Sequence, residues 1–238
     1  MILYYIRHGD PIYEPDSLTE LGKRQAEAIA KRISLHGVDR IFASTSNRAI
    51  LTAKPTSEIL KKDITLLDFC NESHAWDELS LTDENGRRDW IFSHNLTKKL
   101  FVSPEIRRMG DSWYEHPFFK EYNFKKGIDR INTETDKFLK SLGYEHDREN
   151  KIYKPIAHNN ETIALFAHQG FGLAFLSSLL DIPYPEFTVH FDMTHTGMTV
   201  IEFNKTDDVV IPKILTYSND SHIYKEGLPT KYNNWLYL

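Results

Sequence analysis

The chain opens on the stretch Ile2-Leu3-Tyr4-Tyr5-Ile6-Arg7-His8-Gly9-Asp10-Pro11. A short segment rich in β-branched and aromatic residues that ends at Gly and Pro is typical of a buried strand followed by a turn. Open α/β sheets bind their ligands beyond the carboxyl ends of their strands. The stretch therefore predicts an α/β fold in which Arg7 and His8 lie at a strand end suited to chemistry.

The tripeptide Arg7-His8-Gly9 fits phosphate chemistry. A neutral imidazole can act as a nucleophile, and a neighbouring guanidinium can hold the phosphate that it attacks. Glycine lets the backbone come close to a ligand. An Arg-His pair at a strand end is nevertheless more often a surface salt-bridge partner beside a capping histidine, so the other strand ends decide between the two interpretations.

Composition indicates an ordinary soluble globular protein of 238 residues, with 40% hydrophobic and 26% charged side chains. Twenty-nine basic and 34 acidic side chains give a net charge of −5, which disfavours nucleic acid as a partner. The single cysteine, Cys70, excludes an internal disulfide and a thiolate-rich zinc site. No apolar stretch has membrane-spanning length and the first apolar run is too short for a signal peptide, so we expect a cytoplasmic protein with no membrane partner.

Hydrophobic periodicity predicts alternating strands and helices. We expect helices after the caps Thr19 and Ser46, the second kinked or split by Pro55, and further helices over 128–142 and 170–180. Expected strands cover 38–43, 64–67 and 162–167, with a minor strand near 152–156 and a closing hairpin of 198–203 and 209–216. Pro212 favours an edge position for the last strand. This order predicts an α/β protein, a three-layer α/β/α sandwich with a mostly parallel central sheet.

Residues 68–119 break this pattern with mixed charge and scattered aromatic residues. The segment is too long for a plain loop, so we expect one domain over 1–238 with a partly helical insertion at 68–119 that covers the active site. Trp113 and Tyr114 are candidate substrate-pocket residues, although such aromatic residues more often serve packing.

Two more predicted strand ends carry groups that suit an anion. Arg48 follows the strand over 38–43, near a helix N-terminus, and His168 follows the strand over 162–167. Taken singly, Arg48 is typical of a solvated helix residue and His168 of a core histidine. Because parallel strands end at the same edge of a sheet, all of these groups can converge with Arg7 and His8 on one crevice.

Four segments together resemble the histidine phosphatase superfamily, the phosphoglycerate-mutase-like fold. They are Arg7-His8-Gly9, Leu18-Thr19-Glu20-Leu21-Gly22-x-x-Gln25-Ala26, Ser44-x-x-x-Arg48-Ala49-x-x-Thr52-Ala53 and Ala167-His168-x-Gly170. The resemblance implies a metal-independent hydrolysis of phosphate monoesters without a cofactor, in which His8 becomes a phosphohistidine. It also implies that Arg7, Arg48, His168 and Gln169 bind the phosphoryl group of a small phosphorylated metabolite.

The resemblance further implies a carboxylic acid after the third strand that protonates the leaving group. Glu72 fits best, because an aromatic residue, Trp76, follows it, and Glu78 is the runner-up beside Asp68 and Asp77. The glycine-bearing sequence usual after this acid is missing here. A general acid contributes about 10² to 10⁴ in rate.

Three functional readings are open at this point. Asp10-Pro11-Ile12-Tyr13 replaces the Glu-Ser-x-Trp-Asn-like segment usual in phosphoglycerate mutases, which favours a phosphatase over a mutase. A non-catalytic relative that binds a phosphorylated ligand or a protein is the other alternative. His190-x-Asp192-x-x-His195 could suggest a metal site, but such residues before a strand are more often turn and capping groups, so we assign no metal. The sequence leaves the oligomeric state open.

Overall fold

The computed structural model describes residues 1–206 and 208–232, and its centre is a six-stranded sheet in the order β14-β11-β1-β10-β4-β5. Four of its strands, β1, β10, β4 and β5, run parallel, whereas β11 runs antiparallel to both of its neighbours. The mostly parallel sheet predicted from the sequence is confirmed. The strands span Ile2–Arg7 (β1), Arg40–Ser44 (β4), Ile64–Leu67 (β5), Thr162–Ala167 (β10), Met198–Glu202 (β11) and Lys213–Asn219 (β14).

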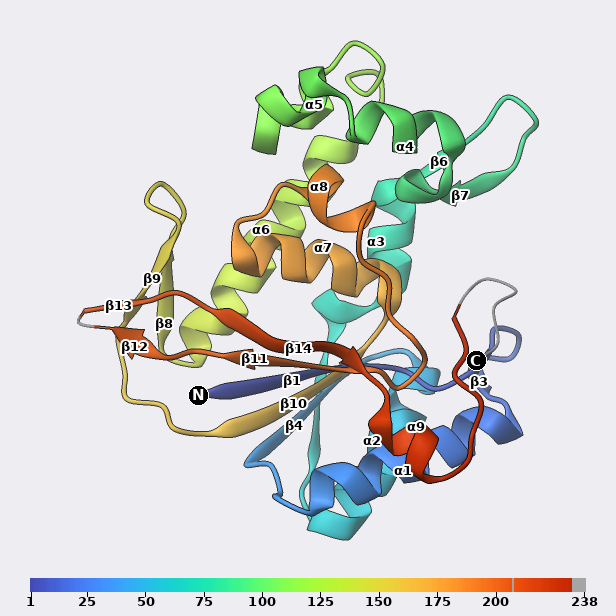
Figure 1. Cartoon of the computed structure of the whole chain (residues 1–238), viewed down its shortest axis with the longest axis vertical. Helices are drawn as coiled ribbons and strands as arrows, with labels where there is room; N and C mark the ends of the chain where they lie inside the picture. Colours follow the sequence, from blue (N-terminus) through green and yellow to red (C-terminus); the bar gives the residue numbers. More distant parts are fainter. Residues whose placement is uncertain (207, 233–238) are drawn as a thin grey trace.

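Helices cover both faces of this sheet, as Figure 1 shows. One face carries α1 (Glu20–Ser34), α2 (Asn47–Leu60) and α9 (Ser221–Lys225), and the other carries α3 (Glu72–Leu79), α6 (Phe124–Ser141) and α7 (Gln169–Leu180). Side chains alternate along β1, so Leu3 and Tyr5 pack in the cluster with α6 and α7, and Ile6 packs in the cluster with α1 and α2. The result is the predicted three-layer sandwich.

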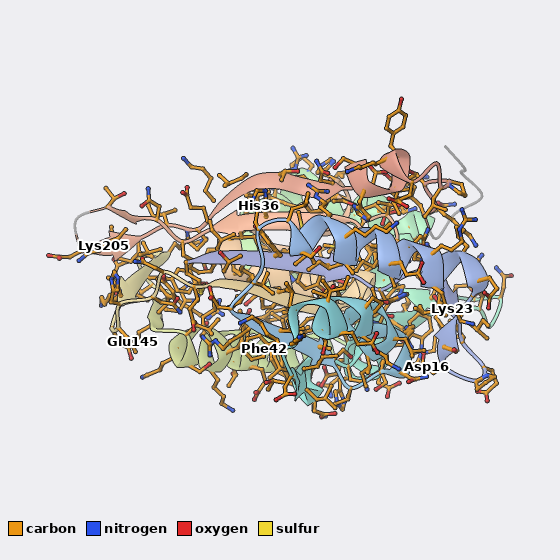
Figure 2. The ribbon with its side chains drawn as sticks, turned by 90° about the horizontal axis from the view of Figure 1, so that it is seen from below. Asp16, Lys23, His36, Phe42, Glu145 and Lys205 are labelled. Carbon is orange, nitrogen blue, oxygen red and sulfur yellow. The ribbon has the colours of Figure 1, made fainter. Side chains whose placement is uncertain are left out.

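The parallel strands all end at the same side of the molecule. Figure 2 shows Asp16 and Lys23, which lie just beyond β1 in the chain, at one end, and Glu145 and Lys205 at the opposite end. The first strand is held there by the start of α1, where Thr19 caps the helix by accepting the N–H of Gly22 at 3.0 Å. A Cβ on Gly9 would lie 2.6 Å from the carbonyl oxygen of Gly22, so only glycine allows this close approach. The short pair β2 (Pro11–Ile12) and β3 (Ser17–Leu18) connects the two elements.

Two local predictions differ from the structure in part. Helix α2 is not split at Pro55, because burial of Ala49, Ala53 and Thr56 holds both of its halves and outweighs one lost backbone hydrogen bond. The expected strand over 209–216 is divided at Pro212. The part after this proline is the edge strand β14, which agrees with the edge position predicted for it.

The part before Pro212 joins a second, smaller sheet. This sheet has the order β12-β13-β9-β8, with strands at Lys205–Thr206 (β12), Val209–Val210 (β13), Ile152–Pro155 (β9) and Tyr144–Asp147 (β8). Strand β9 is the minor strand that the sequence suggested. Among the described residues, no helix has the length and the apolar character that a bilayer span requires.

The segment over 68–119 contains α3 and a layer of short elements above α6 and α7 (Figure 1). These are β6 (Ser80–Thr82), β7 (Arg88–Trp90), α4 (Asn95–Phe101) and α5 (Pro104–Met109), together with 3₁₀ turns at Asp68–Cys70, Ile91–Ser93 and Gly110–Glu115. The layer is tied to α6 and to α8 (Tyr184–Thr188) by an aromatic cluster. Trp113, 1% exposed, is at its centre, with ring centroids 5.7 Å from Phe124 and 5.6 Å from Tyr184.

His146 links the second sheet to α6 and α7. Its Nδ1 lies 2.8 Å from Asp136 and its Nε2 lies 2.8 Å from Asp181, and the side chain is fully buried. Burial alone would lower the pKa of His146, but the bonds to the two carboxylates outweigh it and raise that pKa above the ordinary value. The fold therefore stabilises protonated His146. This contribution is fully present below pH about 6.5, the value for an unfolded chain, and is lost as pH rises through the raised pKa.

We expect His146→Gln to lower the free energy of unfolding by about 1 to 3 kcal/mol near pH 6, and by less at pH 8.5. Urea unfolding of both proteins at the two pH values measures the difference. His36→Gln, which removes an exposed histidine (Figure 2), is the control and should show no such trend. A wild-type advantage that is constant between pH 6 and 8.5 would contradict the assignment.

Candidate active site

His8 follows β1 directly and is 1% exposed. Its Nδ1 lies 2.7 Å from the carbonyl oxygen of Gly9. A carbonyl oxygen only accepts hydrogen bonds, so Nδ1 carries the proton and Nε2 carries the lone pair. Burial, followed by the nearness of Arg7 and Arg48, lowers the pKa of His8 well below its ordinary value. At neutral pH the side chain is therefore an uncharged imidazole whose Nε2 suits nucleophilic attack.

Arg7, the last residue of β1, is completely buried. Its guanidinium donates to the carbonyl oxygen of Met193 and, at 2.8 Å, to Nε2 of His195. The same loop contacts the backbone of His8, because the N–H of Thr196 donates to its carbonyl oxygen at 3.2 Å. Residues 193–196 thus orient both the cation and the imidazole.

Arg48 brings a second guanidinium from the first turn of α2. It donates to Asp16 at 2.9 Å and to Oε2 of Glu72 at 3.1 Å, and its side chain is 11% exposed. The guanidinium also lies over the ring of Tyr13, 5.5 Å from its centroid. Two carboxylates and an aromatic face therefore hold Arg48 in place.

Glu72 is the first residue of α3, which Asn71 caps. Its Oε1 accepts the N–H of Gly170, at the start of α7, at 2.9 Å. Its Oε2 lies 3.6 Å from Nδ1 of His168 as well as close to Arg48. The carboxylate thus lies between the second guanidinium and the second histidine.

His168 lies between β10 and α7 and is fully buried. Its Nε2 lies 2.8 Å from the hydroxyl of Ser44 at the end of β4. Its Nδ1 has no hydrogen-bond partner among the described residues. Burial, then the nearby His8 and Arg48, lowers the pKa of His168 well below its ordinary value. The orphaned nitrogen, with the imidazole ring centroids of His8 and His168 5.2 Å apart, leaves a position for one oxygen of an anion.

Ligand-type atoms of His8, Glu72 and His168 all lie within 4.8 Å of one another. A divalent cation would meet two guanidinium groups here, and it would compete with Arg48 for the carboxylate of Glu72. A phosphoryl group instead matches both the positive charge and the spacing. The donor set therefore fits an anion better than a metal.

A cavity of about 600 Å³ opens beside these groups. The sequence-predicted residues Arg7, His8, Arg48, Glu72 and Gln169 line it. The other lining residues were not predicted: Tyr13, Ser46, Asn71, Ser73, Trp76, Asp89 and Trp90. Most of these unpredicted residues come from the segment over 68–119. The high tryptophan content of this segment indicated a possible pocket wall, but the sequence did not show which of the tryptophans face the cavity.

The competing carboxylates lie elsewhere. Glu78 pairs with Arg130 of α6 at 2.7 Å, and its Cβ lies against Gly127. Asp68 pairs with His74, and Asp77 pairs with Arg88. None of the three carboxylates lines the cavity, whereas Glu72 does.

Trp113 and Tyr114 do not line the cavity beside His8, which corrects the expected pocket contact. Trp113 is buried in the aromatic cluster of the inserted layer, and Tyr114 lies against it, with the ring centroids 5.8 Å apart. Both line a separate, smaller hollow near α6 and α7. Their aromatic surface is used for packing, because the short helices of this layer have little other core.

The string His190-x-Asp192-x-x-His195 forms no cluster of ligand atoms in the described part of the chain. Asp192 instead accepts the side-chain amide of Gln169 at 2.8 Å, and His195 accepts from Arg7. Burial, together with Arg7, lowers the pKa of His195, so it stays an uncharged acceptor. In the sequence, His195 stood out only as part of a possible metal-binding pattern. In the structure its imidazole contacts Arg7, a candidate phosphate-binding residue.

Comparison with known families gives one match. The profile of the family described as histidine phosphatase superfamily (branch 1) matches residues 3–114. No curated protein matches the chain in sequence.

Several solved structures have a similar fold over nearly the whole chain. A mutant phosphoserine phosphatase from Entamoeba histolytica in complex with phosphoserine has a TM-score of 0.58 at 18% identity, over 93% of this chain and 98% of that chain. A mycobacterial glucosyl-3-phosphoglycerate phosphatase has a TM-score of 0.57 at 17% identity, over 91% and 98%. The alpha-ribazole phosphatase from Shigella flexneri has a TM-score of 0.57 at 16% identity, over 92% and 97%. At these identities the likeness establishes a shared fold.

Proposed function

The chain belongs to the histidine phosphatase superfamily, branch 1, and on this premise we propose that it is a metal-independent phosphatase of small phosphate monoesters. The observation that carries the proposal is the uncharged His8 with its Nε2 lone pair, among Arg7, Arg48 and the orphaned Nδ1 of His168. The cavity of about 600 Å³ suits a small molecule. Two of the proteins with a similar fold are phosphatases named for phosphoserine and for glucosyl-3-phosphoglycerate, and these small phosphorylated compounds support the same substrate size.

In the first step Nε2 of His8 attacks phosphorus, and the bond from phosphorus to the alcohol oxygen breaks. Arg7 and Arg48 stabilise the charge on the phosphoryl oxygens, and uncharged His168 donates to one of them from Nδ1 while its Nε2 accepts from the hydroxyl of Ser44. Glu72 gives its proton to the departing oxygen, so the alcohol leaves uncharged. The products of this step are the alcohol and phospho-His8, with Glu72 now ionised.

Glu72 is suited to this role by its position beside the bound phosphate. In the free protein its carboxylate is compensated by Arg48. Because the same guanidinium is proposed to hold the phosphate, the carboxyl group of Glu72 lies next to the departing oxygen.

In the second step water attacks the phosphorus of phospho-His8. Ionised Glu72 takes a proton from the water, the bond between Nε2 and phosphorus breaks, and phosphate leaves. The free imidazole and the protonated carboxyl are regenerated. Atoms and charges balance without a cofactor.

The sequence after Gly9 supports hydrolysis over a mutase reaction. Asp10 is used inside the protein, because its N–H donates to Gln25 at 2.8 Å and its carboxylate binds Thr19 and Lys231. It therefore does not supply the substrate contacts that the corresponding segment is expected to supply in a mutase. We also propose a cytoplasmic location, which the use of a single, buried cysteine, Cys70, supports.

Rapid acid quenching during turnover of a ³²P-labelled monoester tests the proposal. We expect protein-bound label that is stable to base and labile to acid, together with release of free phosphate. Isomerised substrate without free phosphate would indicate a mutase. Phosphate-competitive binding with neither label nor turnover over a broad set of esters would indicate a binding protein.

A further inference from the structure

We infer that this site selects phosphate monoesters whose alcohol part has an apolar surface and no second anionic group. The inference rests on the proposed phosphatase function and specifies its substrate class. It derives from the wall of the cavity that faces away from the two arginines.

Trp90 is directly adjacent to the groups that hold the candidate acid. Glu72 accepts the N–H of Gly170, and a Cβ on Gly170 would lie only 2.2 Å from Cζ2 of Trp90. The indole therefore packs against the same backbone that positions the carboxylate. Trp90 and Glu72 line the same cavity, so an alcohol group that receives its proton from Glu72 has this ring within its surroundings.

Trp76 completes an apolar corner with Trp90. It follows Glu72 by one helical turn on α3, so both side chains lie on the same face of the helix. Its ring centroid is 5.1 Å from that of Trp90, with the planes at 86°. The corner is held from outside, because Phe92 stacks on Trp90 and the guanidinium of Arg88 lies over Trp76. Two fixed indole surfaces at a right angle favour an alkyl or aryl group.

The charged residues that line the cavity also disfavour a second anionic group on the substrate. Apart from Arg7 and Arg48, its described lining contains no Lys or Arg, and the one charge on the tryptophan side is the carboxylate of Asp89. Asp89 is fixed by the N–H of Trp90 at 2.8 Å and by Arg87 at 2.7 Å, and its side chain is 24% exposed. The neighbouring Arg88 forms an ion pair with Asp77 at 3.1 Å.

A second hollow of about 390 Å³ shares Asp89, Trp90 and Gln169 with the first. Its described lining includes Lys98, but also the carboxylates of Asp89 and Asp192. The continuation of the site thus adds no net positive charge. A carboxylate or second phosphate on the substrate would lose water without gaining a cation, whereas an uncharged or cationic group would meet no such penalty.

This selectivity separates the chain from two of the structures that share its fold. Those phosphoserine phosphatase structures hold phosphoserine and 3-phosphoglyceric acid, and both ligands carry a carboxylate beside the phosphate. We expect such compounds to be poor substrates here.

A matched pair of esters tests the charge rule. Phenyl phosphates with a 4-carbamoyl or a 4-carboxylate group have the same shape and differ by one negative charge. We expect kcat/KM to favour the amide by about tenfold, as a single unfavourable charge contact in a partly exposed site gives. In Asp89→Asn the preference should fall to about threefold or less, since removing the carboxylate removes most of the repulsion. The two phenols differ in leaving-group strength, but this difference is the same for both proteins. It therefore cancels when the preference of the wild type is divided by that of Asp89→Asn.

Glu84→Gln is the matched control for Asp89→Asn. It removes an exposed carboxylate from the turn between β6 and β7 that does not line the cavity. The preference for the amide should stay as in the wild type. Trp76→Ala addresses the apolar surface, and should lower the preference for phenyl phosphate over methyl phosphate by about tenfold.

Binding to the His8→Ala variant keeps this inference separate from the proposed function. Calorimetric titration with the same two esters should show the same preference for the amide without any turnover. Equal or tighter binding of the carboxylate ester would overturn the substrate class, even if the wild type hydrolyses both esters. Selective binding of the amide without hydrolysis or phosphoenzyme in the wild type would support the selectivity and reject the phosphatase. Failure of both esters to bind to His8→Ala, together with no hydrolysis of either by the wild type, would reject both the selectivity and the phosphatase.

Discussion

Replacing His8 with Ala is expected to lower kcat/KM for every phosphate monoester by about 10⁴ to 10⁶, the loss typical of removing a nucleophile. The reason is that the described cavity lining offers no second activated nucleophile. The hydroxyls of Ser46 and Ser73 both donate to the side-chain oxygen of Asn71, not to a histidine. Arg7 and Arg48 would still bind phosphate, so KM should change much less than kcat.

Steady-state kinetics and the quench experiment check this result together. His8→Ala should show no base-stable label, while far-ultraviolet circular dichroism and the melting temperature report whether the buried site still folds. Exposed His36 provides the control, and His36→Ala should retain full activity. Turnover within tenfold of the wild type, or label on another residue of His8→Ala, would reject His8 as the nucleophile.

The gathering of Arg7, His8, Arg48 and His168 follows from features that the sequence already contains. Each lies at or just after the end of a strand, and parallel pairing brings the strand ends together, as with Arg7 opposite Ala167. Apolar runs of strand length and helix caps such as Thr19 predict this arrangement without knowledge of long-range contacts. The fold class and the gathering of these four side chains at one edge of the sheet were therefore predictable.

The substrate end was not predictable, because it depends on contacts between distant segments. Trp90 lines the cavity because it packs on Gly170, and Trp113 is buried because α6 and α8 cover it. Trp76, Trp90 and Trp113 all lie in a segment without clear periodicity, so composition could not separate a wall residue from a core residue. The role of His195 was missed for the same reason, since its partner Arg7 is 188 residues away.

The choice between Glu72 and Glu78 depended on helical phase. Both lie on α3, and six residues at about 100° each turn the second carboxylate roughly 240° around the helix. Glu72 therefore meets Gly170 and the cavity, while Glu78 meets Arg130 of α6. The cap Asn71 starts the helix and sets this phase, but only the packing partners show which face points inward.

Glu72→Gln is expected to lower the rate by about 10² to 10⁴ with an alkyl phosphate, because an alkoxide cannot leave without a proton. With 4-nitrophenyl phosphate the first step should lose much less, since nitrophenolate leaves unprotonated. The second step still needs a base, so phospho-His8 should accumulate and a burst of nitrophenol should precede a slow steady state.

Glu78→Gln is the matched control and should keep near-wild-type rates on both substrates, because its carboxylate contacts Arg130 and not the cavity. If Glu78→Gln instead shows the leaving-group dependence and Glu72→Gln hydrolyses the alkyl phosphate normally, the proton donor is not Glu72. The burst amplitude reports the acid role of Glu72 in the first step, and the slow steady state reports its base role in the second. A single kcat value would not separate the two roles, which both depend on the position of Glu72 between Arg48 and His168.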